Sequence, residues 1–380
     1  MKPIQYLALL FLAVVCATCT PSINRRLAAE GERAYVGTYT RDEGWVNGQA
    51  AGLYALTFGK DGRATGQAVV AEITNPSFVV EAGNGQVYAV SELAREGEPT
   101  GYLHVLDPQQ GYAETGKVPT GGKAPCHIEL DRTERYIVTT NYVGGNARVY
   151  RHLPGKVPII TDNFDAKTAN GDVGTPHLHA SQFHPNNRLL AMADLGLDRV
   201  WFFTLDAATG KLAPYLSPYV QLAQGAGPRH LQWSGDGRFL YVINELNATV
   251  SVIALTDAGG LYEIQILPTL PESYTGKNSC ADLHLHPNGR FLYGSNRGHN
   301  SLVIYAVDPT DGRLTLLGHH PTGGDFPRNF AISPDGERIY VANQNSGLIT
   351  THLVDKRTGL LTAVGPSGDI KIPTPVCIEF

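Results

Sequence analysis

A recurring set of charged and polar side chains stands out in a sequence of 380 residues of which only 17% are charged. One group closely follows the proline, or its substitute, that opens a β-rich segment: His127, His179, Arg229, His230, Asp282, Arg328 and Asn329. A second group closes the next β-rich segment: Glu92, Asn141, Tyr142, Asp194, Glu245, Asn296, Arg297, Asn343 and Gln344. A guanidinium group clamps an anion in a fixed fork or steadies an oxyanion, and histidine or glutamate moves a proton or activates water. Together these groups suffice to open or close a lactone ring.

Several other catalytic patterns do not occur in the sequence. It has no Gly-x-Ser-x-Gly elbow, which argues against a serine hydrolase, and no His-Glu-x-x-His pair for zinc. Beyond the N-terminus, Cys126, Cys280 and Cys377 are spaced too widely for a Cys-x-x-Cys metal motif, and three cysteines cannot all pair internally. We therefore predict small buried thiols, no metal site and no cofactor.

The candidate residues follow an internal repeat with a period of roughly 50 residues. Each copy opens with an alternating apolar run, as in NPSFVVEA, APCHIELD, GPRHLQWS and FPRNFAIS, and PHLHASQFHP and SCADLHLHP are looser copies. Turns such as SGDGR and HPNGR follow, in which Asp-Gly and Asn-Gly supply the left-handed residues that tight hairpins need. Three further β-rich runs complete four antiparallel strands, the unit of a propeller blade.

The number of copies predicts seven blades and the way in which the ring closes. The seventh opening run is TPVCIEF at the C-terminus, and its second strand is AYVGTYT at residues 34–40. The last blade therefore takes its inner strand from one end of the chain and its outer three from the other, which removes open sheet edges. We predict an all-β, seven-bladed propeller of four-stranded antiparallel blades over residues 34–380. Six blades are the alternative if one of the looser copies is not a blade.

This architecture would bring the candidate residues together. The first strand of each blade lies beside the central channel, and antiparallel pairing places its start next to the end of the second strand. Both groups of residues then meet around one mouth of the channel, where we predict an anion-binding pocket. The alternative is that these residues only satisfy loop backbone, as they do in propellers without enzymatic activity. Asp282 and Glu245 would then pair with Arg229 and Arg297 in a solvated ring.

Four stretches resemble the seven-bladed β-propeller lactonases: AGPRHLQWSGDGRFLYVINEL, MADLGLDRVWFF, FPRNFAISPDGERIYVANQ and YVGTYT…GLYALTF. That family includes the bacterial propeller-type 6-phosphogluconolactonase and the fungal carboxy-cis,cis-muconate lactonising enzyme. The resemblance runs from about Tyr35 to Phe380. GPRH…NEL is its specific part, whereas the PDG…YV repeats are generic.

The resemblance implies a metal-independent site on the funnel face of the propeller. It places catalytic groups at the four positions that match the proposed active site of the muconate enzyme: His179, Arg229, Glu245 and Arg297. Substrate binding is expected at the remaining mouth positions: His127, Asn141, His230, Asp282, Arg328, Asn329 and Gln344. The arginines would hold the substrate and polarise its carbonyl, and Glu245 or His179 would activate water.

Three functions fit this set of residues. The first is hydrolysis of a sugar-acid lactone by a 6-phosphogluconolactonase-like enzyme. The second is a lactonising cycloisomerase of the carboxymuconate type, in which the same groups protonate a carbon. The third is a non-catalytic propeller that binds an anionic glycan or protein. For an enzyme the expected partner is a small-molecule lactone or sugar acid, and the net charge of −5 argues against nucleic acid.

The N-terminal stretch MKPIQYLALLFLAVVCATC has the pattern of an export signal. A lysine precedes an apolar run from Ile4 to Val15 that is too short to span a membrane, and no other segment could span one. We predict a signal peptide over residues 1–19, a linker over 20–33, and a periplasmic or extracellular location. A lipid anchor at Cys19 is the alternative. Because sugar phosphates are cytoplasmic, export favours a lactone without phosphate.

Residues 1 to about 18 should be absent from the mature protein, because their apolar run matches an export signal in length and position. N-terminal sequencing or the intact mass of the protein isolated from its host measures this. A cytoplasmic form that retains Met1 would contradict the prediction and would favour 6-phosphogluconolactone as the substrate.

Overall fold

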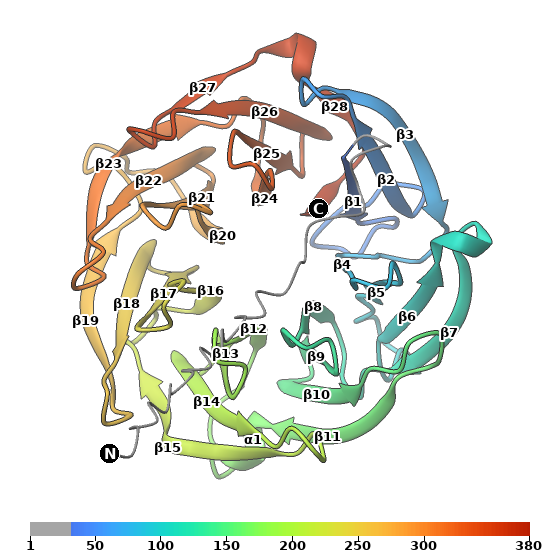
Figure 1. Ribbon diagram of the computed structural model, residues 1–380, viewed down its shortest axis with the longest axis vertical. Coiled ribbons are helices and arrows are strands. Elements are labelled where there is room, and N and C mark those ends of the chain that lie inside the picture. Colours follow the sequence, from blue (N-terminus) through green and yellow to red (C-terminus); the bar gives the residue numbers. More distant parts are fainter. Residues whose placement is uncertain (1–31) are drawn as a thin grey trace, which may run out of the picture. The chain divides into compact units, whose positions relative to one another are not determined.

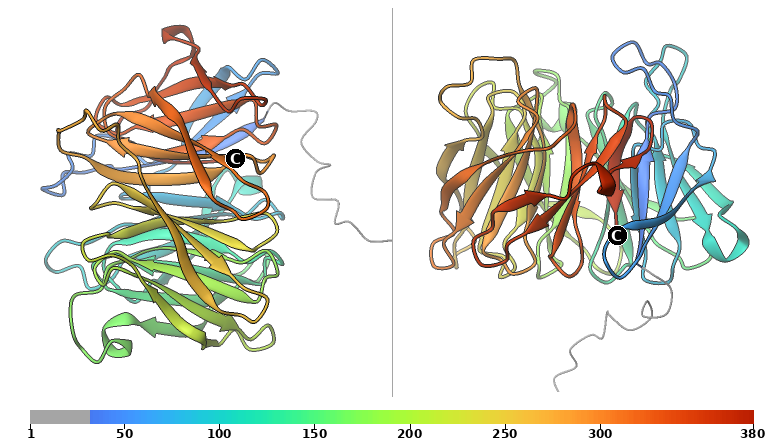
Figure 2. Two further views of the ribbon diagram at one scale, coloured as in Figure 1. Left: turned by 90° about the vertical axis from the view of Figure 1, so that its left-hand side faces the viewer. Right: turned by 90° about the horizontal axis from the view of Figure 1, so that it is seen from above.

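The strands of each repeat pair into one antiparallel sheet in the computed structural model, which describes residues 32–380. Seven such sheets are arranged around a central axis as the blades of a propeller (Figure 1). The side views of Figure 2 show the strands crossing the thickness of a disc. The predicted all-β, seven-bladed architecture is therefore confirmed for this part of the chain. The predicted signal peptide, and all but the last two residues of the predicted linker, lie outside the described residues.

Six blades are built from strands that are consecutive in the chain. Blade 1 consists of β4 (Phe78–Glu81), β5 (Val87–Ser91), β6 (Tyr102–Asp107) and β7 (Ala113–Pro119). Blade 2 consists of β8 (Pro125–Leu130), β9 (Tyr136–Asn141), β10 (Asn146–Arg151) and β11 (Ile159–Asp165). Blade 3 consists of β12 (Leu178–Phe183), β13 (Leu189–Asp194), β14 (Arg199–Leu205) and β15 (Leu212–Gln221). Blade 4 consists of β16 (Pro228–Trp233), β17 (Phe239–Asn244), β18 (Thr249–Leu255) and β19 (Leu261–Pro268). Blade 5 consists of β20 (Ser279–Leu285), β21 (Phe291–Arg297), β22 (Ser301–Val307) and β23 (Leu314–Pro321). Blade 6 consists of β24 (Pro327–Ile332), β25 (Arg338–Asn343), β26 (Leu348–Val354) and β27 (Leu361–Ala363), and β28 (Ile370–Lys371) also pairs with β26.

Short helical segments interrupt the strands at three places. They are α1 (Ala166–Ala169) and two 3-10 turns, η1 (Pro108–Gln110) and η2 (Pro366–Gly368). No helix within residues 32–380 is long and apolar enough to cross a membrane.

Blade 7 closes the ring with strands from both ends of the chain. Its order is β29 (Pro375–Glu379), β1 (Arg33–Thr38), β2 (Leu53–Phe58) and β3 (Ala64–Ala71), and Val36 pairs with Ile378. The predicted closure is thus confirmed. Strand β1 begins at Arg33, one residue before the predicted start of the domain.

Adjacent blades are joined by apolar packing and by a repeated tyrosine. Clusters of buried side chains lie between neighbouring sheets, such as Phe202 of blade 3 with Trp233 of blade 4. In the second strand of a blade, a buried tyrosine donates a hydrogen bond to a carbonyl in the outer hairpin of the next blade. Tyr241 reaches Gly312 O at 3.1 Å, and Tyr340 reaches Gly62 O at 2.7 Å. The last of these bonds ties blade 6 to the closing blade.

A β-bulge near the start of the inner strand recurs from blade to blade. In β16, Pro228 pairs with Asn244 and His230 with Ile243, so that Arg229 is the extra residue. The equivalent extra residues in β8, β12, β24 and β29 are Cys126, His179, Arg328 and Val376. In β20 the pairing skips both Ala281 and Asp282. Bulges re-aim side chains and free backbone groups from the ladder, and they are common next to active sites.

Removal of residues 373–380 should abolish cooperative folding, because blade 7 loses its inner strand and the ring opens. Phe380→Ala is the matched control, since it removes one side chain packed on Phe58 and Tyr340 but keeps the strand. Circular dichroism during heating should show a broad, shallow transition for the truncation and a sharp one for the control. A sharp transition of the truncated protein near the wild-type temperature would show that β29 is dispensable.

Candidate active site

The extra residues of the inner-strand bulges gather at one mouth of the channel. A cavity of about 540 Å³ opens there. Its lining comes from several blades: Trp45, Glu92, Ala94, Ala124, Cys126, Tyr142, Val143, His179, Arg229, Glu245, Arg297, Phe326, Arg328, Gln344 and Asn345. We call it the mouth cavity. Four of these residues, Cys126, His179, Arg229 and Arg328, are bulge residues.

Two arginines of the mouth cavity hold one carboxylate between them. Oε2 of Glu245 lies 2.9 Å from Nε of Arg229 and 2.9 Å from Nη2 of Arg297. The guanidinium groups also donate to carbonyls of the bulged strand β20, with Arg229 Nη1 2.6 Å from Ala281 O and Arg297 Nη2 2.8 Å from Cys280 O. Both head groups are therefore fixed before any ligand binds.

Burial and pairing act in opposite directions on this cluster. Burial raises the pKa of Glu245, but the charges of Arg297, Arg229 and Arg328 outweigh it and bring that pKa below 4.5. Burial lowers the pKa of Arg297 to about 10, although Glu245 opposes the change. At neutral pH the carboxylate and the guanidinium are both charged. Three arginines against two carboxylates, Glu245 and Glu92, leave the lining of the cavity with an excess of positive charge.

The third arginine is held from the opposite side by an aromatic pair. Arg328 Nη2 donates to the Tyr39 hydroxyl at 2.9 Å, and that hydroxyl donates to Oε2 of Glu92 at 2.8 Å. The Arg328 guanidinium also lies 5.7 Å from the ring centre of Trp45, within cation–π range. Burial and the neighbouring Glu92 raise the pKa of Tyr39 well above 10, although Arg328 opposes this, so the hydroxyl keeps its proton.

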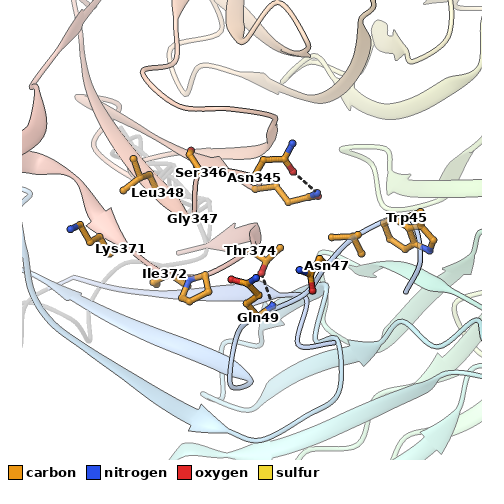
Figure 3. Close-up of a pocket in the computed structure, with 13 residues that line it drawn as sticks. Trp45, Asn47, Gln49, Asn345, Ser346, Gly347, Leu348, Lys371, Ile372 and Thr374 are labelled. Atoms are coloured by element: carbon orange, nitrogen blue, oxygen red, sulfur yellow. Dashed lines mark hydrogen bonds between the residues drawn. The ribbon is translucent and has the colours of Figure 1, made fainter. Parts of the chain in front are cut away.

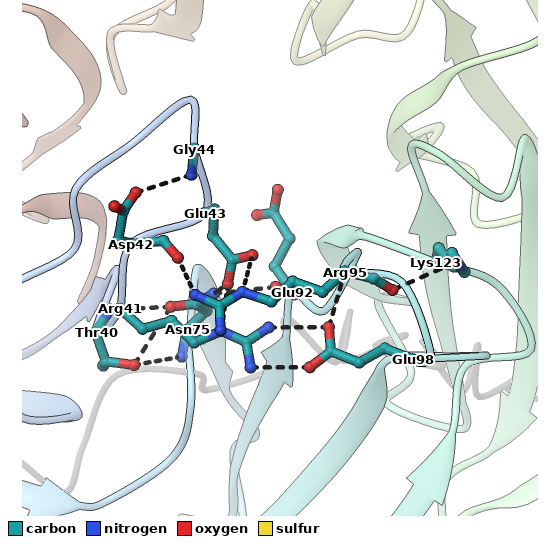
Figure 4. Close-up of polar contacts among 10 residues, drawn as sticks. All are labelled: Thr40, Arg41, Asp42, Glu43, Gly44, Asn75, Glu92, Arg95, Glu98 and Lys123. Atoms are coloured by element: carbon teal, nitrogen blue, oxygen red, sulfur yellow. Dashed lines mark hydrogen bonds and ion pairs between the residues drawn. The ribbon is translucent and has the colours of Figure 1, made fainter.

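Trp45 belongs to one of two long loops that wall the cavity on one side. The loop of residues 39–52 joins β1 to β2, and that of residues 92–101 joins β5 to β6, whereas the equivalent turn of blade 4 spans only 245–248. An ion-pair network fastens the two loops together (Figure 4). Glu43 contacts Arg41 and lies 3.3 Å from Nε of Arg95, while Arg41 lies 2.8 Å from Glu98.

A polar groove lies between blades 6 and 7, next to the mouth cavity (Figure 3). Its volume is about 760 Å³, and it shares Trp45, Gln344 and Asn345 with the mouth cavity. Asn47 and Lys371 are further polar groups along it. The groove and the mouth cavity thus adjoin each other at these three residues.

A small void lies at the bottom of the mouth cavity. It has a volume of about 10 Å³, and His179, Arg229 and His230 are among its lining residues. Burial, and next Arg229, lower the pKa of His179 well below 6.5, so its ring is neutral. Its buried Nδ1 has no hydrogen-bond partner among residues 32–380.

The structure brings together seven of the predicted site residues. Six line the mouth cavity: His179, Arg229, Glu245, Arg297, Arg328 and Gln344. His230 lines the small void below. The funnel arrangement is therefore as predicted, while the roles assigned to these residues stay predictions.

Four residues expected to bind substrate line neither cavity: His127, Asn141, Asp282 and Asn329. Asn141 is fully buried and donates to Thr120 O at 3.1 Å. Asn329 donates to Asp282 at 2.6 Å and accepts from Ile378 N at 2.7 Å, so its amide is used inside the channel. The ring of His127 packs on Phe78 with centroids 4.4 Å apart. For His127 and Asn329, the bulge turns the preceding residue toward the mouth instead. The expected role of these four residues in substrate binding stays a prediction.

Sequence reasoning missed two aromatic contributors, Tyr39 and Trp45. Tyr39 lies at the end of AYVGTYT, the predicted second strand of blade 7, a position that the repeat pattern could have included. Trp45 lies in the loop of residues 39–52, outside the repeat that guided the prediction. The length of that loop relative to its equivalents is the signal that could have found Trp45. The Arg297 guanidinium lies 5.1 Å from the ring centre of Phe326. Because Phe326 directly precedes the proline of FPRN, its place in the repeat could have predicted that it lies at the mouth.

The three cysteines of the propeller lie in its interior. Cys126, Cys280 and Cys377 are buried and free, as predicted. Within residues 32–380, no three His, Cys, Asp or Glu side chains are grouped closely enough to hold a metal ion.

Residues 33–380 match the protein family described as "Lactonase, 7-bladed beta-propeller". This chain belongs to that family. A 6-phosphogluconolactonase of Formosa agariphila is 33% identical over 313 residues, which cover 78% of this chain and 85% of the relative. A 6-phosphogluconolactonase of Bacillus subtilis is 28% identical and covers 78% and 83%. Among solved structures, the periplasmic gluconolactonase PpgL of Pseudomonas aeruginosa is similar with a TM-score of 0.80, 30% identity, and coverage of 91% and 98%.

Glu245→Gln should destabilise this lactonase-family protein at pH 7, because it leaves two buried guanidinium groups without their counter-charge. Since Glu245 keeps some solvent contact, we expect a loss of about 2 kcal/mol, below the roughly 3 to 5 kcal/mol of fully buried pairs. The folded-state pKa is lowered, so this contribution is present above pH 4.5 and disappears as the pH falls through the folded-state pKa. The difference between wild type and variant in urea unfolding should shrink accordingly.

Glu337→Gln is the matched control for this measurement, because Glu337 forms an exposed pair with Lys356 at 3.0 Å. Its effect should stay below about 1 kcal/mol. Equal stability of wild type and Glu245→Gln at pH 7 would mean that the carboxylate does not hold the arginines in solution.

Proposed function

We propose that the protein is a carboxylic ester hydrolase that opens a sugar-acid lactone at the mouth cavity, in the manner of a 6-phosphogluconolactonase. The convergence of Arg229, Arg297 and Arg328 on one cavity carries the proposal. Relatives named 6-phosphogluconolactonase and a structural neighbour named periplasmic gluconolactonase support it. The cavity volume of about 540 Å³ lies within the usual range of small-molecule sites.

The arginines supply what lactone hydrolysis needs most. Attack of water on the lactone carbonyl converts its oxygen into an oxyanion, and fixed donors aimed at that oxygen stabilise the transition state. Arg229 and Arg297 are held in place by Glu245 and by backbone carbonyls, so little reorganisation is required when the charge develops. Glu245 and His179 are both in a proton-accepting form at neutral pH.

The surroundings of the arginines suit a polyhydroxylated ligand. Gln344, Asn345 and Asn47 offer amide donors and acceptors, and Trp45 offers an aromatic face along the groove. Such groups satisfy sugar hydroxyls without demanding a charge. We propose a sugar-acid lactone without phosphate for an exported protein, supported by the signal-like pattern of residues 1–19 and by the periplasmic neighbour.

Arg229→Ala should lower the turnover of an aldonolactone by roughly 100-fold or more, the usual cost of losing a transition-state donor. Arg229→Lys should restore only part of the rate, because an ammonium group cannot reproduce the guanidinium fork. Hydrolysis of a panel of aldonolactones, with and without phosphate, measured by acid release at constant pH, tests both variants and identifies the substrate.

Arg238→Ala is the control, because Arg238 lies on the surface and pairs with Asp236 at 2.7 Å. It should leave turnover unchanged. A wild-type protein that opens no lactone of the panel would contradict the proposal. A ligand that binds through Arg229 without being turned over would identify a binding propeller instead.

A further inference from the structure

A histidine–aspartate pair lies directly behind Arg229. Nδ1 of His230 is 2.6 Å from Oδ1 of Asp282, a carboxylate that is almost completely buried. Asp282 is itself fixed through its other oxygen by His284 at 2.8 Å and by Asn329 at 2.6 Å. A carboxylate this well anchored holds the neighbouring imidazole in the tautomer with the proton on Nδ1. The lone pair of His230 is then on Nε2.

The free face of His230 borders the small void below the mouth cavity. No hydrogen bond to Nε2 of His230 is formed within residues 32–380, whereas Nδ1 is taken by Asp282. The void of about 10 Å³ has close to the room that one water molecule requires. Its lining includes His230, His179, Arg229 and Arg328, so a water there would lie between a base and the arginines. Glu92 also lines the void, but Oε2 of its carboxylate already accepts a hydrogen bond from the Tyr39 hydroxyl at 2.8 Å.

We propose that His230 is the general base of lactone hydrolysis and that Asp282 is its positioning residue. This inference rests on the proposed function. It assigns the proton transfer to neither of the groups that the sequence favoured, Glu245 and His179.

The step balances with the groups present. The oxygen of a water in the void forms a bond to the lactone carbonyl carbon, and one of its protons moves to Nε2 of His230. The carbonyl electron pair becomes the oxyanion beside the arginines. When that pair returns, the bond between the carbonyl carbon and the ring oxygen breaks, and the ring oxygen takes the proton from His230. The product is the open hydroxy acid, and its carboxyl group then ionises.

Two comparisons within the site favour His230 over the other candidates. Oε2 of Glu245 lies 2.9 Å from two guanidinium groups, and their charges oppose protonation of this carboxylate. His179 has no carboxylate partner, and its Nδ1 is buried without a hydrogen bond among the described residues.

The charged and titratable groups around His230 keep its ring neutral before reaction. Burial and Arg229 lower the pKa of His230 to about 4, against the opposing influence of Asp282. His284, which pairs with Asp282, also lowers it, and the rings of His127 and His179 lie 5.7 Å and 5.2 Å away. The ring is therefore ready to accept a proton at neutral pH. The positive charge of Arg229 opposes transfer of a proton to His230, and the negative charge of the oxyanion that forms beside Arg229 offsets it.

His230→Asn provides the direct test, because its amide can still donate to Asp282 in place of Nδ1 but carries no base. We expect kcat for the aldonolactone to fall roughly 100-fold or more while KM changes only a fewfold, as for loss of a general base. For His230→Ala, added imidazole should restore part of the lost turnover, since a small base can enter the vacated space.

His319→Ala is the histidine control. His319 lies in β23, the outer strand of blade 5, and its Nε2 donates to Thr269 O at 3.0 Å. It lines neither the mouth cavity nor the small void. Turnover of this variant should stay within a fewfold of wild type, with no response to imidazole.

Asp282→Asn tests the positioning role of Asp282. The pH dependence of kcat/KM is measured, because a loss of stability alone would not change it. The amide favours the tautomer with the proton on Nε2, so kcat should fall with KM unchanged and without rescue by imidazole. Removing the carboxylate lowers the pKa of His230 further, so the acid limb of kcat/KM should shift to lower pH. If the acid limb of Asp282→Asn lies at the same pH as that of wild type, Asp282 has no part in the mechanism.

The outcomes separate this inference from the proposed function. If wild type hydrolyses a lactone and Arg229→Ala impairs it, while folded His230→Asn keeps kcat within a fewfold, His230 is not the base and only this inference fails. If wild type hydrolyses none of the lactones, the proposed function fails first. Thermal unfolding of each variant establishes that it is folded.

Discussion

The bulge near the start of the inner strand is the constraint on which the site depends. An unbroken strand would alternate its side chains between the two faces of the blade, and only every second residue would reach a given face. The extra residue lets Arg229 and Arg328 turn toward the mouth while the following residue keeps its place in the ladder. In β20 the same irregularity frees the carbonyls of Cys280 and Ala281, which then anchor the two arginines that flank Glu245.

Closure of the ring decides which bulges meet. The channel mouth is shared by all blades, so the lining of the mouth cavity is assembled from residues far apart in the chain. Blade 7 completes this ring by joining β29 to β1. The loops of residues 39–52 and 92–101 break the symmetry, because they stand higher than the short turns and are joined by ion pairs. In the right-hand view of Figure 2 these blue and cyan loops rise above one side of the disc. They add the aromatic face of Trp45 to a cavity otherwise built from the repeat.

Electrostatic preorganisation links the fold to the proposed chemistry. Burying three guanidinium groups near one another is unfavourable unless each is paired or hydrogen-bonded. Glu245 serves two of them, and Tyr39 with Glu92 serves the third. The result is a fixed cationic wall that costs little to reorganise when an oxyanion forms against it. The neutral histidines deeper in the channel complement this wall, because a proton acceptor there must not carry a positive charge already.

The repeat in the sequence was sufficient to predict the propeller, its seven blades, the closing strand TPVCIEF and the gathering of Arg229, Glu245 and Arg297 at one mouth. These follow from local features, since proline, turn residues and apolar alternation each act over a few residues. The sequence could not show which of two adjacent polar residues faces the cavity. A bulge shifts the alternation of inward and outward side chains by one residue, and no residue type marks where it occurs. For that reason Asn329 and His127 were expected in the pocket and lie outside it. The partnership of His230 with Asp282, which are 52 residues apart, was likewise decided only by the tertiary structure, because it depends on the packing of two neighbouring inner strands around the channel.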